Sequence, residues 1–99
     1  MNKFLRQAQQ LQAQLAKAQE ELTNLTLESS AGGGAVKVTV DGQQKIKSIK
    51  ISLEVVNKQD VELLEDMVLA GVSEALEKSR QAAQDKLGGL TGGLKLPGM

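Results

Sequence analysis

The chain lacks cysteine and histidine altogether, and Phe4 is the only aromatic residue among its 99 residues. Without cysteine there can be no disulfide and none of the thiolate ligands of structural zinc sites. Without histidine, the commonest general base and the usual activator of a nucleophilic serine are also missing. The composition therefore argues against an enzyme, and it predicts no catalytic residue, no metal site and no bound cofactor.

Long apolar runs are missing as well. The N-terminal segment MNKFLRQAQQ turns polar within a few residues, and no apolar stretch is long enough to cross a bilayer. We therefore expect neither a signal peptide nor a membrane span, and a cytoplasmic protein. A chain of this length forms one domain with a small aliphatic core, for which a second chain would be a useful support.

Neither sign of charge predominates. Twelve Lys and Arg balance twelve Asp and Glu, so the formal net charge is zero. Proteins that coat nucleic acids are usually strongly basic, and neutrality counts against such a role unless the charges are unevenly distributed. The positions of the cations along the chain therefore matter more than their number.

The N-terminal quarter of the chain carries a heptad pattern. Apolar residues recur there in alternating steps of four and three, with glutamines and few charges between them, which predicts a helix over residues 3–24. The narrow stripe suits packing against one or two other helices. Its members are Phe4, Ala8, Leu11, Leu15, Ala18, Leu22 and Leu25.

Three strands are expected to follow, over residues 25–30, 35–41 and 45–53. The first two are separated by a glycine run at 32–34, and the last two by the tight turn Asp41-Gly42. Ile46 is out of phase with the later isoleucines of its strand. A β-bulge near Lys47-Ser48 would correct the phase, or Ile46 covers a second surface. The three strands form an antiparallel meander.

A second helix is expected over residues 58–87, after the capping residue Asn57. Its segment 67–72 is apolar on every side, and one small sheet can cover only one of those sides. We therefore expect a homodimer whose interface includes Met67, Val68, Leu69 and Val72. Glycine pairs and Pro97 predict a flexible tail over residues 88–99, outside a single domain of residues 1–87.

The expected topology brings basic residues from the two helices to the same end of the molecule. Because the first helix ends where the sheet begins and the second begins where the sheet ends, their free ends would form one distal tip of two parallel arms. That tip would be basic, and the ends of the arms next to the sheet would be acidic. The predicted tip cations are Lys3, Arg6, Lys78, Arg80 and Lys86.

A second set of cations lies on the strands, at Lys37, Lys45, Lys47 and Lys50. Lysines on strands often serve only to keep sheet edges from pairing with other chains. For these four we favour that interpretation over a phosphate-binding role.

Three motifs in this order resemble the YbaB/EbfC family of bacterial nucleoid-associated proteins: SAGGGAVKV at 30–38, LEDMV at 64–68, and LTGGL at 90–94 followed by LPG at 96–98. The resemblance spans nearly the whole chain. It implies an α+β fold with an α-β-β-β-α protomer, a three-stranded antiparallel sheet, two long helices and a tweezers-like homodimer. It also implies DNA binding through the helical arms, a nucleoid location, and effects on DNA conformation and gene expression. The chain departs from the family in its glutamine-rich first helix and in lacking a proline after the last strand.

Two functions remain open at this stage. The first is a homodimer that binds double-stranded DNA with low sequence specificity, because phosphate contacts by Lys and Arg need no aromatic stacking and no row of base-reading side chains. The alternative is a dimeric adaptor that engages another protein through the heptad stripe and the glycine-rich tail.

Overall fold

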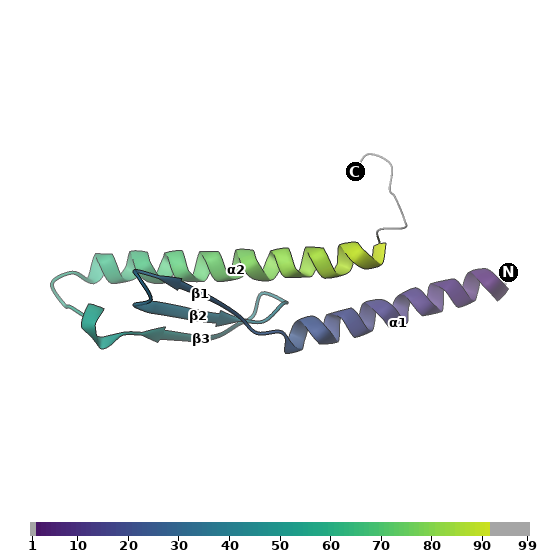
Figure 1. The fold of residues 1–99 in the computed structure, drawn as a ribbon, viewed down its shortest axis with the longest axis horizontal. Coiled ribbons are helices and arrows are strands. Elements are labelled where there is room, and N and C mark those ends of the chain that lie inside the picture. Colours follow the sequence, from purple (N-terminus) through teal and green to yellow (C-terminus); the bar gives the residue numbers. More distant parts are fainter. Residues whose placement is uncertain (1, 92–99) are drawn as a thin grey trace, which may run out of the picture.

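The computed structural model describes residues 2–91, with the side chain of Thr91 excepted. Its elements follow the predicted order: α1 (Asn2–Asn24), β1 (Leu27–Ala31), β2 (Val36–Val40), β3 (Ile46–Ile51), the short 3₁₀ helix η1 (Leu53–Val55) and α2 (Val61–Thr91). The α+β class and the α-β-β-β-α order are confirmed. The molecule is a flat rod of 68 × 29 × 15 Å, with α2 lying along the sheet and α1 continuing the rod beyond it (Figure 1).

The sheet is an antiparallel meander in the order β1-β2-β3. Thr39 pairs with Ser48, but the next residue, Val40, pairs with Ile46, so the register shifts and Lys47 is the extra residue on β3. This is the predicted β-bulge. Since residues paired across antiparallel strands share a face, the bulge brings Ile46 onto the apolar face of the sheet.

The core lies between the sheet and α2. Its fully buried members are Val36, Val38, Val40 and Ala75, so every second residue of β2 faces the helix. Gly71 allows the close approach, because a Cβ there would lie 3.1 Å from a methyl carbon of Val38. The buried Ser29 hydroxyl donates to the Gly71 carbonyl oxygen at 2.5 Å, which satisfies the polar atom within this apolar layer.

The helix α2 continues past its predicted end. Glycine pairs led us to expect the helix to stop at residue 87, yet Gly88 and Gly89 are helical and α2 ends at Thr91. Each interior glycine costs about 1 kcal/mol relative to alanine. The helix nevertheless continues to Leu90, which is partly buried and lines a cavity of about 220 Å³ together with Gln14 and Ala18 of α1. Residues 92–99 of the predicted tail lie outside the described residues.

The heptad stripe of α1 is only half covered. Ala18 and Leu22 are buried near α2, whereas Phe4 is 76% exposed. Figure 1 shows the reason, since the N-terminal part of α1 extends beyond the end of α2. The predicted helix-helix seam therefore exists only near the sheet.

The close approach at Gly71 gives a test of the core. Gly71→Leu should destabilise the fold by about 1–3 kcal/mol or more, because the added side chain pushes α2 away from β2. Ala70→Leu is the matched control, because Ala70 is the exposed neighbour on the same helix. Thermal unfolding measures both, and equal melting temperatures would contradict this packing.

Candidate nucleic-acid interface

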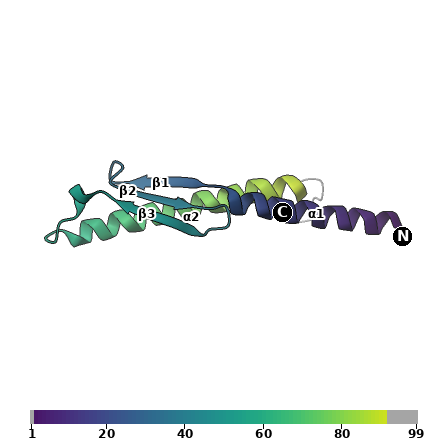
Figure 2. The ribbon, with the colours of Figure 1, turned by 90° about the horizontal axis from the view of Figure 1, so that it is seen from below.

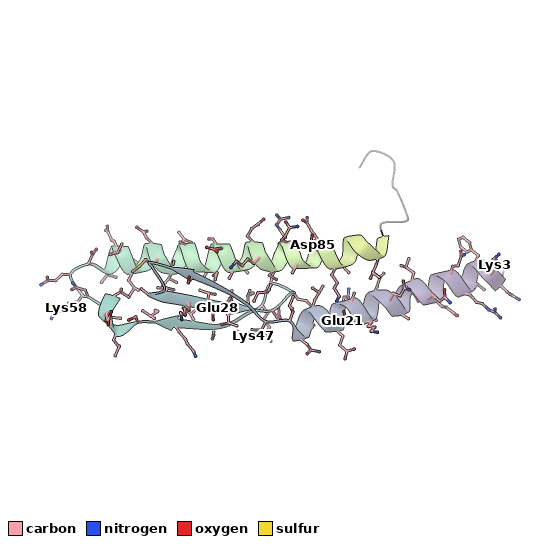
Figure 3. The ribbon with its side chains drawn as sticks, viewed as in Figure 1. Lys3, Glu21, Glu28, Lys47, Lys58 and Asp85 are labelled. Carbon is pink, nitrogen blue, oxygen red and sulfur yellow. The ribbon has the colours of Figure 1, made fainter. Side chains whose placement is uncertain are left out.

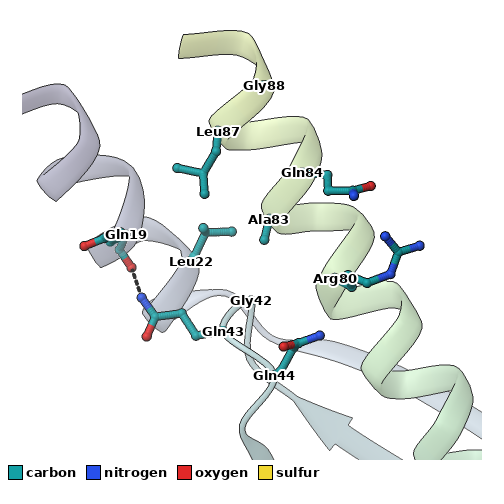
Figure 4. Close-up of a pocket in the computed structure, with 10 residues that line it drawn as sticks. All are labelled: Gln19, Leu22, Gly42, Gln43, Gln44, Arg80, Ala83, Gln84, Leu87 and Gly88. Carbon is teal, nitrogen blue, oxygen red and sulfur yellow. Dashed lines mark hydrogen bonds between the residues drawn. The ribbon is translucent and has the colours of Figure 1, made fainter. Parts of the chain in front are cut away.

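The turn between β2 and β3 connects both helices to the sheet. We call its residues, Asp41 to Gln44, the arm joint. The Gly42 N–H donates to the carbonyl oxygen of Leu22 near the end of α1, at 2.8 Å. The Gln43 side-chain amide donates to the Gln19 carbonyl oxygen at 3.0 Å (Figure 4). The arm joint therefore fixes where α1 leaves the sheet.

The arm joint also holds α2. The backbone N–H of Gln44 donates to the hydroxyl of the buried Ser79, at 2.7 Å. Gln44 has a φ of 64°, in the left-handed region that side chains other than glycine adopt at a cost. Beside this contact, an open cavity of about 700 Å³ separates α1 from α2, and Leu22, Ala83 and Leu87 form its apolar walls (Figure 4).

Asp41 holds the arm joint together from inside. Its carboxylate is almost fully buried and accepts the backbone N–H groups of Gln43, at 2.7 Å, and Lys45, at 3.0 Å. The hydrogen bond from the Lys45 backbone, with that from Gln43 and the charges of Lys47 and Lys45, holds the pKa of Asp41 below its ordinary value. The joint therefore depends on an ionised carboxylate.

Two of the predicted tip cations lie at the free end of α1. Lys3 and Arg6 are exposed, and within residues 2–91 neither forms an ion pair. The first turn of α1 contains no acidic residue, so the positive end of the helix dipole adds to their charge. Figure 3 shows Lys3 at the far end of the rod.

The other three predicted cations are not at that end, and the expectation of one shared tip is wrong. Lys78 lies over the sheet, where its ammonium group donates to the carbonyl oxygen of Glu28 at 2.8 Å. From Lys78 to Thr91, α2 continues for roughly 20 Å, at 1.5 Å per residue. The prediction failed because the first half of α2 lies along the sheet, and because α1 extends beyond the end of α2 (Figure 1).

Each of these three cations has a carboxylate partner. Lys86 of α2 pairs with Glu21 of α1, and this ion pair links the two helices. Arg80 donates from Nε to Glu77 at 3.0 Å. Lys78 lies 3.5 Å from Glu74.

The ion pairs change the acidity of their members. The hydrogen bond and the charge of Lys86 lower the pKa of Glu21, and those of Arg80 lower the pKa of Glu77. In turn, Glu77 raises the pKa of Arg80. All of these side chains are substantially exposed, and exposed pairs contribute little to stability. Little stability is therefore lost when one of these cations leaves its carboxylate partner.

An apolar patch lies beside the edge strand β3. Ile51, Leu64, Val68, Leu69 and Val72 line an open cavity of about 460 Å³, together with Glu65. Leu69 is 66% exposed and adjoins the other apolar residues of this cavity, so the apolar surface is continuous and open. We call this surface the β3–α2 patch.

Three of the four predicted dimer residues, Val68, Leu69 and Val72, lie in the β3–α2 patch, but Met67 does not. The Met67 sulfur lies next to Gly32 of the β1–β2 turn, at a position where a Cβ on Gly32 would collide with it. Met67 therefore packs within the fold of the single chain. Ile51 and Leu64 belong to the patch and were missed. The alternation of β3 identified Ile51 as apolar, but no sequence pattern shows that α2 packs on β1 and β2 and leaves Ile51 of β3 beside an open cavity.

The described part of the chain shows neither a metal-binding cluster nor a membrane-spanning helix. No group of three or more His, Cys, Asp or Glu side chains within residues 2–91 could hold a metal ion. Over the same range, no helix is both long and apolar enough to cross a membrane.

The fold belongs to a known structural class. It matches the crystal structure of the uncharacterized protein HP0035 from Helicobacter pylori with a TM-score of 0.81 and 12% sequence identity, over 91% of this chain and 95% of that one. At that level of identity, the likeness concerns the fold alone.

Sequence comparison is more specific than the likeness in fold and identifies the family. The model of the YbaB/EbfC DNA-binding family matches residues 1–94, and the chain belongs to this family. A protein of Pelotomaculum thermopropionicum named "Nucleoid-associated protein" is 48% identical over 99 residues, which cover 100% of this chain and 94% of the relative. A protein of the same name from Moorella thermoacetica is 48% identical over 98 residues, covering 99% and 94%. The resemblance inferred from the three motifs is thereby confirmed.

The buried carboxylate of the arm joint predicts a pH dependence. Because folding lowers the pKa of Asp41, its ionised form stabilises the fold above the unfolded value, near 3.8, and this stabilisation is lost as the pH falls through the lower folded value. At pH 7, Asp41→Asn should cost about 1.5–3 kcal/mol through weaker hydrogen bonds. The difference from the unaltered protein should shrink below about pH 4.

Chemical denaturation at several pH values measures this difference. Asp85→Asn is the control, because it removes a carboxylate from the exposed surface of α2 without touching the arm joint. A cost for Asp41→Asn that stays constant from pH 7 to pH 2 would show that the charge of Asp41 does not stabilise the joint.

Proposed function

We propose that the protein binds double-stranded DNA on the nucleoid as a homodimer, mainly through phosphate contacts and with low sequence specificity. The observation that carries this proposal is the pair of cations at the free end of α1. Lys3 and Arg6 are exposed in the first turns of α1, at the end of an elongated rod, and have no carboxylate partners among residues 2–91. Family membership supports DNA as the ligand.

The chemistry of the arm favours phosphate over base contacts. Exposed Lys and Arg side chains gain affinity by releasing the counterions of DNA, whatever its sequence. Phe4 is the only aromatic residue of the chain, so stacking on bases is limited to one side chain per protomer. We therefore expect strong salt dependence and weak discrimination among sequences. Lys78, Arg80 and Lys86 would join these contacts by exchanging carboxylates for phosphates.

A homodimer is supported by the β3–α2 patch. Exposed apolar surfaces of this kind commonly mark contacts between proteins. The patch adjoins the edge strand β3, and a second copy of the same patch would cover both. Two protomers joined there would carry two arms, and simultaneous contacts by both arms would alter the path of the DNA and thereby gene expression. The relatives' name supports a nucleoid location.

A single charge reversal tests the arm. Arg6→Glu should weaken binding to a fluorescent duplex of mixed sequence, because it replaces an attraction to phosphate with a repulsion. The slope of log K against log salt should also become shallower by about 1 for each phosphate that the altered side chain no longer neutralises. Fluorescence anisotropy at several salt concentrations measures both effects.

Lys58→Glu is the matched control, since Lys58 is an exposed cation at the opposite end of the rod (Figure 3). Equal loss of affinity in the two variants would contradict the arm model. If the unaltered protein does not bind the duplex even at low salt, the proposed function is wrong, and a protein partner of the exposed heptad stripe becomes the better hypothesis.

A second substitution tests the homodimer. Leu69→Asp should shift the protein from dimer to monomer without unfolding it, because Leu69 contributes more to the open surface than to the core. Leu63→Asp is the control, since Leu63 is 52% exposed on the same helix but does not line the patch. Analytical ultracentrifugation distinguishes the two. A monomeric unaltered protein, or a Leu69→Asp variant that stays dimeric, would contradict the interface.

A further inference from the structure

The sheet has a second, polar face that α2 does not cover. Figure 2 shows the three strands in front of α2, with no helix on their outer side. Ser30 of β1 pairs with Lys37 of β2, and Lys37 pairs with Lys50 of β3. These three residues form one row across the sheet on the face opposite the buried valines. We call it the lysine row.

The two lysines lie directly opposite each other, which makes them costly neighbours. Directly paired residues on antiparallel strands have Cβ atoms about 4.5–5.5 Å apart, and like charges there are destabilising. Neither Lys37 nor Lys50 takes part in an ion pair within the described chain. Lys78, Arg80 and Lys86, by contrast, all have carboxylate partners.

Little negative charge on this face offsets the lysines. Glu28 is the acidic residue of β1, and it pairs with Thr39 in the next row, diagonal to Lys37. Asp41 is buried in the arm joint, where its charge acts on Lys45 and Lys47. The lysine row is therefore a local concentration of positive charge on a chain with no net charge.

Protection of the sheet edge does not account for this arrangement. Lysines guard edge strands against pairing with other chains, which fits Lys50 on the edge strand β3. Lys37, however, lies on the central strand β2, whose two edges are already paired. A lysine there gives no edge protection, and its position opposite Lys50 adds repulsion.

We propose that the lysine row is a second DNA-contacting surface, where Lys37 and Lys50 bind phosphate groups of the backbone and the Ser30 hydroxyl donates a further hydrogen bond. This inference rests on the proposed DNA-binding function. A phosphate between the two ammonium groups would turn their repulsion into a shared attraction. The row stays open in the proposed homodimer, because Ile51 pairs with the buried Val36 and so lies on the opposite, apolar face.

Substituting the two lysines tests the contribution of the lysine row to DNA binding separately from that of the arms. Lys37→Gln with Lys50→Gln should weaken binding to the mixed-sequence duplex and lower the salt slope by about 0.9 for each phosphate no longer neutralised, at most about 1.8 per protomer. Without DNA, the melting temperature should stay the same or rise, because the repulsion between the lysines is gone. Lys37→Arg with Lys50→Arg should keep the salt slope of the unaltered protein.

Lys58→Glu is again the control, since it changes the net charge by the same two units away from the sheet. If the double glutamine variant matches this control in affinity and slope while Arg6→Glu weakens binding, the lysine row does not bind DNA but the arm still does. If the unaltered protein fails to bind the duplex at any salt concentration, the proposed function fails and the lysine row with it.

Discussion

The geometry of the molecule depends on one turn, the arm joint at Asp41 to Gln44. Through backbone and side-chain hydrogen bonds, this turn holds the end of α1 and the middle of α2 against the same end of the sheet. Gly42 is required there, because a Cβ would lie 2.8 Å from the Leu22 carbonyl oxygen. The buried carboxylate of Asp41 in turn fixes the turn itself. The direction of the arm is thus set by a handful of polar contacts, since the apolar contact between the helices is small.

The joint explains how a neutral protein presents separate basic surfaces. By directing α1 away from the sheet, it separates Lys3 and Arg6 from the carboxylates of α2. Closer to the joint, the helices lie near each other, and Lys86 is neutralised by Glu21. On the sheet, the strand register places Lys37 opposite Lys50 and away from α2. DNA responds to such local charge through its phosphates, so an overall charge of zero does not oppose the proposed function.

Much of the fold could be predicted from periodicity. The steps of four and three in α1, the alternation in β2 and the phase error at Ile46 each report a local repeat, and the helix, the strand and the bulge follow from them. The end of α2 was predicted wrongly, because Gly88 and Gly89 are poor helix formers by themselves and yet lie within the last turns of α2. Contacts between segments that are far apart in the chain leave no periodic pattern in the local sequence, so they could not be predicted from it.

In the candidate site too, some features follow from the local sequence and others only from the tertiary structure. The sequence by itself determined the order of the elements, the near absence of aromatics and the identity of the cations, since these follow from local patterns and composition. Only the tertiary structure decided which cations have carboxylate partners, that Met67 faces Gly32 while Leu69 remains exposed, and that Lys37 faces Lys50. These outcomes depend on how α2 crosses the sheet and on the pairing register, and both are set by packing between residues far apart in the chain.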